Sequence, residues 1–414
     1  MLSATARLGW RELTLTLVGA AAAASCGGEG ANGTAAVHDS AGVRIVENAA
    51  PDPQLVPLWT LDAQPRLDIG ALEGSEAETL FRVVDGTRLS DGRIVIANAG
   101  TSEVRYFTID GTHAATVGGQ GAGPGEFMGI GNIIPMTADS IAIVDVRLQR
   151  LTVLDPDGSH AREIASAPDA PATIVGLLSD GRWLAAARNV MPPDQLVQGI
   201  TRPEVTYVAI ARDGDAAFDT VGMFPGAERH LHVEMSNSTI QSVDITLPPF
   251  SRATRIATHG DEIVIGTQDH PELRFYGSDG RLIRIVRTGV SPRPVTQELL
   301  EEYVERRLED DPEEQRAQMR ERMLRVASAE FVPPYGDLVV DDTGNLWVQD
   351  YPDVSDEQSW TVYDSQGMMI ARILLPPAFA PFEIGDDWIL GRELDDLDVE
   401  HVRIYGIRRS ASPR

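Results

Sequence analysis

Two histidines of this chain, His230 and His232, have the residue type and the spacing to hold a metal ion. A single residue separates them, so in a β-strand both imidazoles would project from the same face, close enough for one metal. The sequence assigns no third ligand, and the other six histidines are scattered and mostly adjoin turns. The pair therefore predicts a divalent metal as the candidate cofactor, with its ligand set incomplete.

Three pairs of adjacent aspartates, Asp341–Asp342, Asp386–Asp387 and Asp395–Asp396, could bind calcium. All of them lie at expected turns, where Asp side chains cap backbone amides, and none has the loop spacing of a helix-loop-helix calcium site. The chain also lacks the Gly-x-Ser-x-Gly and His-Glu-x-x-His motifs and has no paired Cys ligands. The sequence thus assigns no catalytic residues.

The run Gly119-Gln120-Gly121 with Pro124 loosely imitates a loop that binds a dinucleotide or phosphate. Such a loop must open a helix whose N-terminus faces the phosphates, but here a further strand pattern follows.

The charge of the chain bears on its partners: all 35 basic residues are Arg, and 62 acidic residues give a formal net charge of -27. This balance argues against nucleic acid as a partner and against binding to an anionic lipid surface.

The elements that must position any site come from a repeat. The segments 91–111, 138–158 and 260–280 align without gaps, each with two β-rich runs and a closing Asp-Gly turn. Such turns join antiparallel strands because Gly tolerates a positive φ. Looser copies begin at Asp180, Thr343 and Gly385. Six units, the first two of which start 47 residues apart (91 to 138), predict a six-bladed β-propeller.

The last unit lacks its outer strand at the C-terminus. The segment Pro65–Ile69 parallels the outer strand that ends the first unit, so we predict that it is the fourth strand of the last blade. Such a strand closes the ring and removes its free edges. Trp59 and the run Val43–Val46 are expected to pack nearby or to add strands.

Between Thr296 and Val326 the apolar period changes from 2 to about 3.6. This change predicts a helical hairpin inserted between blades four and five. Asp311 is the expected cap of the second helix, with Pro312 at its first position. The hairpin is either a surface excursion docked on neighbouring blades or a lid over one mouth of the ring.

The first 26 residues predict export and a lipid anchor. Two arginines precede the apolar stretch 13–24, which is short for a membrane span but suits a secretory signal. The lone cysteine, Cys26, stands in a segment that resembles the lipobox of bacterial lipoproteins, with Ala23 where Leu is more usual. The alternative is a signal peptide followed by a free thiol. Residues 27–40, rich in Gly and Ala, predict a flexible tether at the outer membrane or periplasmic face.

A family resemblance rests on the Gly-Pro-Gly-Glu-Phe link within Gly118–Phe127 and on the strand-turn phrases around Asp91, Asp139 and Gly344. These residues resemble the six-bladed, NHL-like propellers that are common among bacterial lipoproteins. The resemblance covers about residues 60–408. It implies an architecture more than an activity, because that superfamily includes both scaffolds and enzymes.

We therefore expect an all-β chain. A six-bladed β-propeller of four-stranded antiparallel blades occupies 41–408, closed by an N-terminal strand, with the helical insertion at 296–327 and a tail at 409–414. The expected function is a monomeric scaffold that binds a protein, a small molecule or a glycan in the cell envelope. The alternative is a metal-assisted hydrolase, lactonase or lyase with its site at the central channel.

Overall fold

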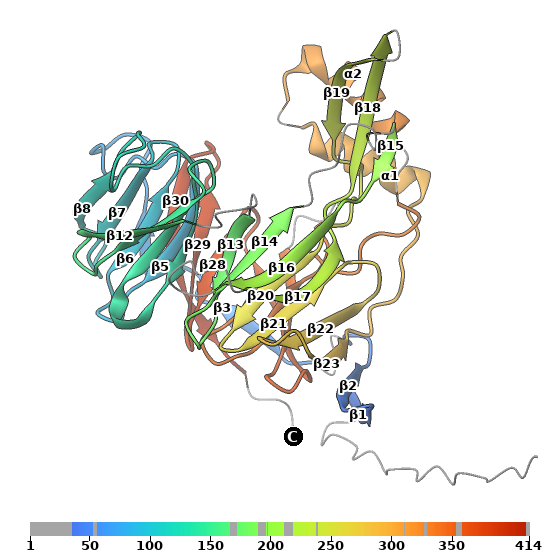
Figure 1. The fold of residues 1–414 in the computed structure, drawn as a ribbon, viewed down its shortest axis with the longest axis horizontal. Coiled ribbons are helices and arrows are strands. Elements are labelled where there is room, and N and C mark those ends of the chain that lie inside the picture. The colour runs from blue at the N-terminus through green and yellow to red at the C-terminus, as the bar shows by residue number, and fades with distance from the viewer. Residues whose placement is uncertain are drawn as a thin grey trace, which may run out of the picture.

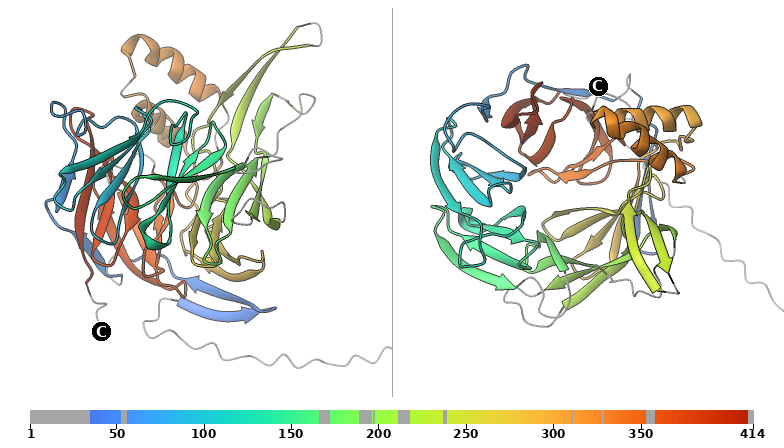
Figure 2. Two further views of the ribbon diagram at one scale, coloured as in Figure 1. Left: turned by 60° about the vertical axis from the view of Figure 1, so that its left-hand side comes forward. Right: turned by 90° about the horizontal axis from the view of Figure 1, so that it is seen from above.

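The computed structural model describes residues 35–52, 56–165, 172–188, 196, 198–210, 218–236, 239–309, 311–326, 329–352 and 358–410. They form a six-bladed β-propeller, and the view from above shows the blades following one another around a ring (Figure 2). None of the helices in these residues is long and apolar enough to cross a membrane.

Each blade is a four-stranded antiparallel sheet whose first strand lies innermost. Blades one to three comprise β5 (Val83–Arg88), β6 (Ile94–Asn98), β7 (Glu103–Phe107) and β8 (His113–Gly118); β9 (Ile130–Pro135), β10 (Ile141–Asp145), β11 (Arg150–Leu154) and β12 (His160–Ala165); and β13 (Ala172–Leu177), β14 (Trp183–Arg188), β16 (Glu204–Ile210) and β17 (Phe218–Pro225). Blades four to six comprise β20 (Arg255–His259), β21 (Glu262–Gly266), β22 (Glu272–Gly277) and β23 (Leu282–Arg287); β24 (Leu338–Val340), β25 (Leu346–Gln349), β26 (Gln358–Tyr363) and β27 (Met369–Leu375); and β28 (Ala380–Ile384), β29 (Trp388–Leu394), β30 (Glu400–Arg408) and β4 (Leu67–Ile69).

The core is divided into layers between neighbouring blades. In the layer between blades one and two, Val95 and Tyr106 of the first blade pack against Ile133 and Ile143 of the second. Both faces of the middle strands are covered, so every residue of β6 and of β10 is buried. This burial explains why the middle strands are short continuous apolar runs and carry no polar face.

The N-terminal segment closes the ring. Strand β4 pairs antiparallel with β30, with Ile69 opposite Val402, which confirms the predicted fourth strand of the last blade. Strand β3 (Leu58–Leu61) joins β27 and β30 and so bridges blades five and six. Its Trp59 contacts Trp347 edge-on in the core between those blades.

Two further strands extend blade four outward. β2 (Val43–Asn48) pairs in parallel with β23, and β1 (Ala35–Ser40) pairs with β2, so the run Val43–Val46 adds a strand as expected. The tether predicted up to Ser40 is therefore too long. Ala35 and Val37 belong to the folded part of the chain and not to the tether, because they pack against the core beside Val46.

Two insertions follow blades three and four. The first, here called the arm, is the hairpin of β18 (Arg229–Ser236) and β19 (Thr239–Thr246), to which β15 (Gly199–Thr201) adds a third strand. The second is the pair of helices α1 (Gln297–Arg307) and α2 (Glu313–Arg325) between β23 and β24.

The two helices differ in how their N-termini are capped. The Thr296 side chain caps α1 by accepting a hydrogen bond from the Leu299 N–H at 3.2 Å. Helix α2 begins one residue later than the sequence suggested. Its N-cap is Pro312, which offers no side-chain acceptor, so Asp311 is not the cap.

Candidate functional site

The insertions gather on one rim of the ring. Strands alternate in direction within a blade. The connection that enters the first strand of a blade and the connection between its second and third strands therefore lie on the same rim of the ring. The arm fills the link into β20, the helices fill the link into β24, and β15 lies in the link between β14 and β16. We call this side the insertion rim (Figure 1). Short Asp-Gly turns form the opposite side, the turn rim.

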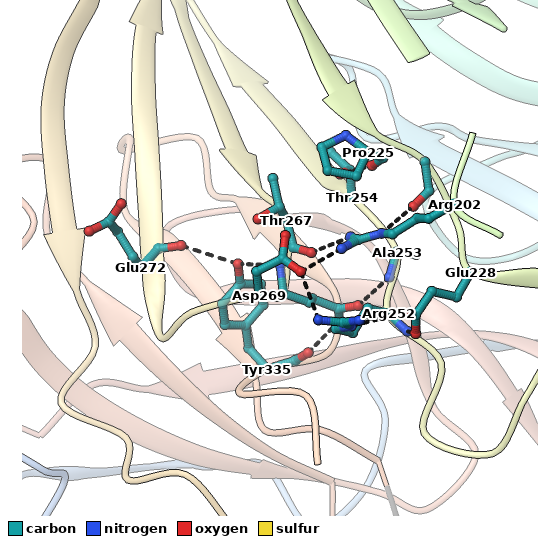
Figure 3. Close-up of polar contacts among 12 residues, drawn as sticks. Arg202, Pro225, Glu228, Arg252, Ala253, Thr254, Thr267, Asp269, Glu272 and Tyr335 are labelled. Atoms are coloured by element: carbon teal, nitrogen blue, oxygen red, sulfur yellow. Dashed lines mark hydrogen bonds and ion pairs between the residues drawn. The ribbon is translucent and has the colours of Figure 1, made fainter. Parts of the chain in front are cut away.

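Ion pairs fix the base of the arm to blade four (Figure 3). The carboxylate of Asp269, in the link after β21, accepts hydrogen bonds from Arg202 at 2.6 Å and from Arg252 at 2.9 Å. Arg252 also donates to the buried Glu228 at 2.9 Å. Arg202 donates to the Gly226 carbonyl at 2.8 Å. Asp269 thereby connects blade four to both ends of the arm and to the segment of blade three that contains Arg202.

Gln268 carries this network toward blade five. Its side chain is 1% exposed, and its Oε1 accepts a hydrogen bond from the Ala253 N–H at 2.6 Å. The hydroxyl of Tyr335 accepts from the Gln268 N–H at 3.1 Å and donates to the Glu272 carbonyl at 3.2 Å. Buried polar networks whose members are paired rigidify a structure. The insertion rim between blades three and five is therefore held in one arrangement.

A cavity of about 570 Å³, here called the polar cavity, opens at this rim where the innermost strands of blades four, five and six begin. Arg255 and Asp337 form an ion pair of 2.9 Å in its wall. Three residues that line it each have one buried side-chain donor without a hydrogen-bond partner among the described residues: Nε of Arg255, Nε of Arg392 and Nε1 of Trp360. An unpaired buried donor costs about 1–3 kcal/mol. The polar cavity is thus suited to a ligand that supplies acceptor oxygens.

A second cavity, of about 450 Å³, adjoins the first, and Thr254 lines both. We call it the apolar cavity. Val175, Val205 and Tyr207 of blade three contribute to its wall, and Leu231 and Ile245 of the arm cover it. Leu231 and Ile245 are paired across the arm, so their side chains share one face of its sheet. The two cavities are neighbours that share Thr254 in their walls, the first mainly polar and the second mainly apolar.

Two carboxylates on the innermost strands titrate near neutrality. Burial raises the pKa of Asp85 to about 7 and that of Glu383 to about 7. Asp85 accepts a hydrogen bond of 2.8 Å from the Ile133 N–H of blade two. Glu383 accepts hydrogen bonds of 2.8 Å from the Thr87 hydroxyl and the Arg88 N–H of blade one. Both side chains join neighbouring blades, and each can hold a proton near neutral pH.

The predicted metal ligands lie on the arm, away from the polar cavity. His230 and His232 are two residues apart on β18, and both line a cavity that faces α2. Asp244 lies opposite His232 on β19. Within the described ranges, no group of three or more His, Cys, Asp or Glu side chains is arranged to hold a metal ion. Cys26, the predicted lipid attachment site, lies outside those ranges.

Two aspartates of the adjacent pairs, Asp341 and Asp395, cap turns. Oδ1 of Asp341 accepts hydrogen bonds from the backbone N–H groups of Thr343 and Asn345 at 3.0 and 2.9 Å. Oδ1 of Asp395 does the same for Leu397 and Val399 at 2.8 and 2.9 Å. Because these oxygens already bind backbone amides, the turn interpretation of both residues is confirmed.

The sequence did not reveal the residues of the two cavities. Trp360 was visible only as part of a repeat, and Arg255 and Arg392 stood among many arginines. The long interval between the repeat copies that end at Gly214 and begin at Gly260 could have indicated the arm. No local motif joins these residues, because the ring brings them together from three blades.

Comparisons with known proteins agree with the architecture. A family model described as a 6-bladed β-propeller matches residues 71–184, which span blades one and two and the first strands of blade three. No curated protein matches the chain.

Several solved structures are similar at low identity. A Bacteroides fragilis protein described as exported is 14% identical, with a TM-score of 0.49 over 88% of this chain and 99% of that one. A Bacteroides vulgatus protein is 10% identical, with a TM-score of 0.48 over 84% and 98%. A Xanthomonas campestris gluconolactonase is 12% identical, with a TM-score of 0.41 over 86% and 98%. On its own strand order and the family match, the chain is a six-bladed β-propeller.

Proposed function

We propose that this propeller is exported, is anchored by a lipid on Cys26, and binds an extended peptide segment of an envelope protein on its insertion rim. The binding site is the polar cavity together with the adjoining apolar cavity. The observation that carries the proposal is that three residues lining one cavity, Arg255, Trp360 and Arg392, each keep a buried donor that has no partner among the described residues.

A peptide segment matches the chemistry of both the polar cavity and the apolar cavity. Its backbone carbonyls are acceptors for donors of the cavity wall. One apolar side chain of the segment would enter the apolar cavity beneath Leu231 and Ile245. The fixed base of the arm supports this assignment, because a site that is already ordered loses less entropy on binding.

The export signal and the lipobox-like segment before Cys26 support an extracytoplasmic location. The metal-assisted alternative has less support: His230 and His232 lie on the arm and not among the residues that line the polar cavity. Binding is therefore the function that the described residues favour.

The test is selection of peptides from a random heptapeptide library with the exported protein, followed by affinity measurement for the best peptide. Trp360→Phe removes one unpaired donor and Arg392→Gln weakens another, and each should lower the affinity about tenfold. Trp388→Phe, the same replacement at the start of β29 on the turn rim, should leave it unchanged. Failure to select any peptide, or selection of peptides that all three variants bind equally, would reject this site. Binding of envelope oligosaccharides in place of peptides would reject the peptide assignment.

A further inference from the structure

The arm has two chemically different faces. Leu231 and Ile245 point into the apolar cavity, whereas His230, His232 and Asp244 line a different cavity of about 380 Å³ against α2. This division follows from the alternation of side chains along β18 and β19. The second face is therefore available for a ligand of its own.

The cavity between the arm and α2, here called the basic cavity, gathers positive groups in a strongly acidic protein. Arg322 and Arg325 of α2 face the two histidines, and Asp244 is the one carboxylate among its lining residues within the described part of the chain. Arg325 pairs with Glu321. The Arg322 guanidinium has no ion pair or hydrogen bond among the described residues. Arg322 is exposed, so its charge is accessible to a ligand.

An apolar chamber continues directly from the basic cavity. It has a volume of about 430 Å³, and Thr246, Arg322 and Val326 line both spaces. Met319 and Met323 of α2 form part of its wall. Arg307 and Asp311, of opposite charge, also line the chamber.

Methionine walls suit flexible chains because the thioether side chain is unbranched and adaptable. Leu247, at the end of the arm, also lines the chamber although its side chain is 66% exposed. Such a large exposed apolar side chain beside a cavity gains free energy when an apolar chain covers it. The chamber thus offers an apolar counterpart to the charge of Arg322.

We propose that the basic cavity and its apolar chamber bind one amphipathic anion, an acyl chain that ends in a carboxylate or phosphate. The head group binds the Arg322 guanidinium beside His230 and His232, and the chain lies between Leu247 and the methionines of α2. This site lies on the opposite face of the arm from the proposed peptide site. The two proposals can therefore fail separately.

The experiment uses the exported protein with Cys26→Ser, which avoids detergent, and titrates it with decanoate by calorimetry. We expect one decanoate per chain. Decyltrimethylammonium, with the same chain and the opposite charge, and acetate, with the same charge and no chain, should each bind at least tenfold more weakly. Equal binding of decanoate and decyltrimethylammonium would overturn the proposal.

Variants assign the binding to these residues. Arg322→Gln should weaken decanoate about tenfold, the loss of one charge-assisted hydrogen bond, and Met319→Gln should weaken it through the chain. Matched replacements outside the site, Arg281→Gln and Met223→Gln, should have no effect; both side chains are largely exposed. Unchanged affinity in Arg322→Gln would overturn the assignment. Flotation with phosphatidylglycerol vesicles that requires Arg322 would identify a membrane lipid as the source of the chain, whereas decanoate binding without flotation would identify a free acid.

Discussion

The carboxylate of Glu383, on the innermost strand of the last blade, accepts a hydrogen bond of 2.8 Å from the hydroxyl of Thr87 on the first blade. The same oxygen accepts the Arg88 N–H at 2.8 Å. A titratable side chain therefore takes part in the contact between the first and last blades. Burial raises its pKa to about 7, and the charge of Asp342 adds to the rise.

This raised pKa predicts that the protein loses stability as the pH rises. The folded state binds the Glu383 proton more tightly than the unfolded state, whose pKa is about 4.5. Stability should therefore fall between about pH 4.5 and pH 7 and then level off. Asp85, with its pKa raised to about 7, contributes in the same direction. Thermal unfolding at pH 5, 6, 7 and 8 measures the combined effect.

Glu383→Gln isolates one of the two groups. Both hydrogen bonds reach a single oxygen of Glu383, so the amide oxygen of Gln can accept them without a charge. The variant should be more stable than the natural protein at pH 8, and the difference should shrink as the pH falls toward about 4.5. Glu73→Gln, in an exposed loop, is the matched control. A Glu383→Gln variant that is less stable at pH 8 would show that the ionised carboxylate is favourable there.

Ring closure by β4 predicts a large effect from a single side chain. Ile69 is 3% exposed and packs against Val402 and Ile404 of the last strand. Ile69→Ala should lower the free energy of unfolding by about 2–4 kcal/mol, because it leaves a cavity at the junction of the two chain ends. Leu72→Ala, three residues later and 64% exposed, should change it by less than about 0.5 kcal/mol. Urea unfolding followed by tryptophan fluorescence distinguishes the two outcomes, and equal effects would contradict the closure.

The network around Asp269 predicts a local effect. Asp269→Asn weakens the contacts with Arg202 and Arg252, which hold the base of the arm. Hydrogen exchange should become faster in β15 and β18 and stay unchanged in β6 and β10, because those strands belong to other blades. Asp279→Asn on the turn rim is the control. Faster exchange throughout the ring would show that Asp269 stabilises the whole propeller and not the arm.

The sequence predicted the repeating part of this fold well and the inserted part poorly. The Asp-Gly turns at Gly92, Gly158 and Gly280 have positive φ values of 90°, 86° and 76°, the backbone geometry for which only Gly is well suited. Their regular recurrence made the blades visible. The polar cavity depends on Arg255, Trp360 and Arg392, which no local pattern relates to one another.

The arm also could not be predicted from local sequence patterns. Its strands have alternating apolar residues that look like those of any blade, and the pairing of β15 with β18 depends on the tertiary structure. His230 and His232 line one cavity, but their spacing could not show that this cavity is not the polar cavity. A repeat predicts the elements that it contains, whereas a site between elements requires their positions.

The proposed lipid anchor predicts a change in both mass and location. If Cys26 is acylated, the mature protein begins at that residue, carries the mass of its acyl groups and sediments with the membrane fraction. Cys26→Ser should remove the acyl mass and move the protein to the soluble extracytoplasmic fraction without changing its thermal unfolding, because the described strands start at Ala35, after Cys26. Intact-protein mass spectrometry of both forms checks the first point, and fractionation checks the second. A Cys26→Ser protein that stays with the membrane at high salt would contradict the anchor and leave the uncleaved apolar stretch 13–24 as the attachment.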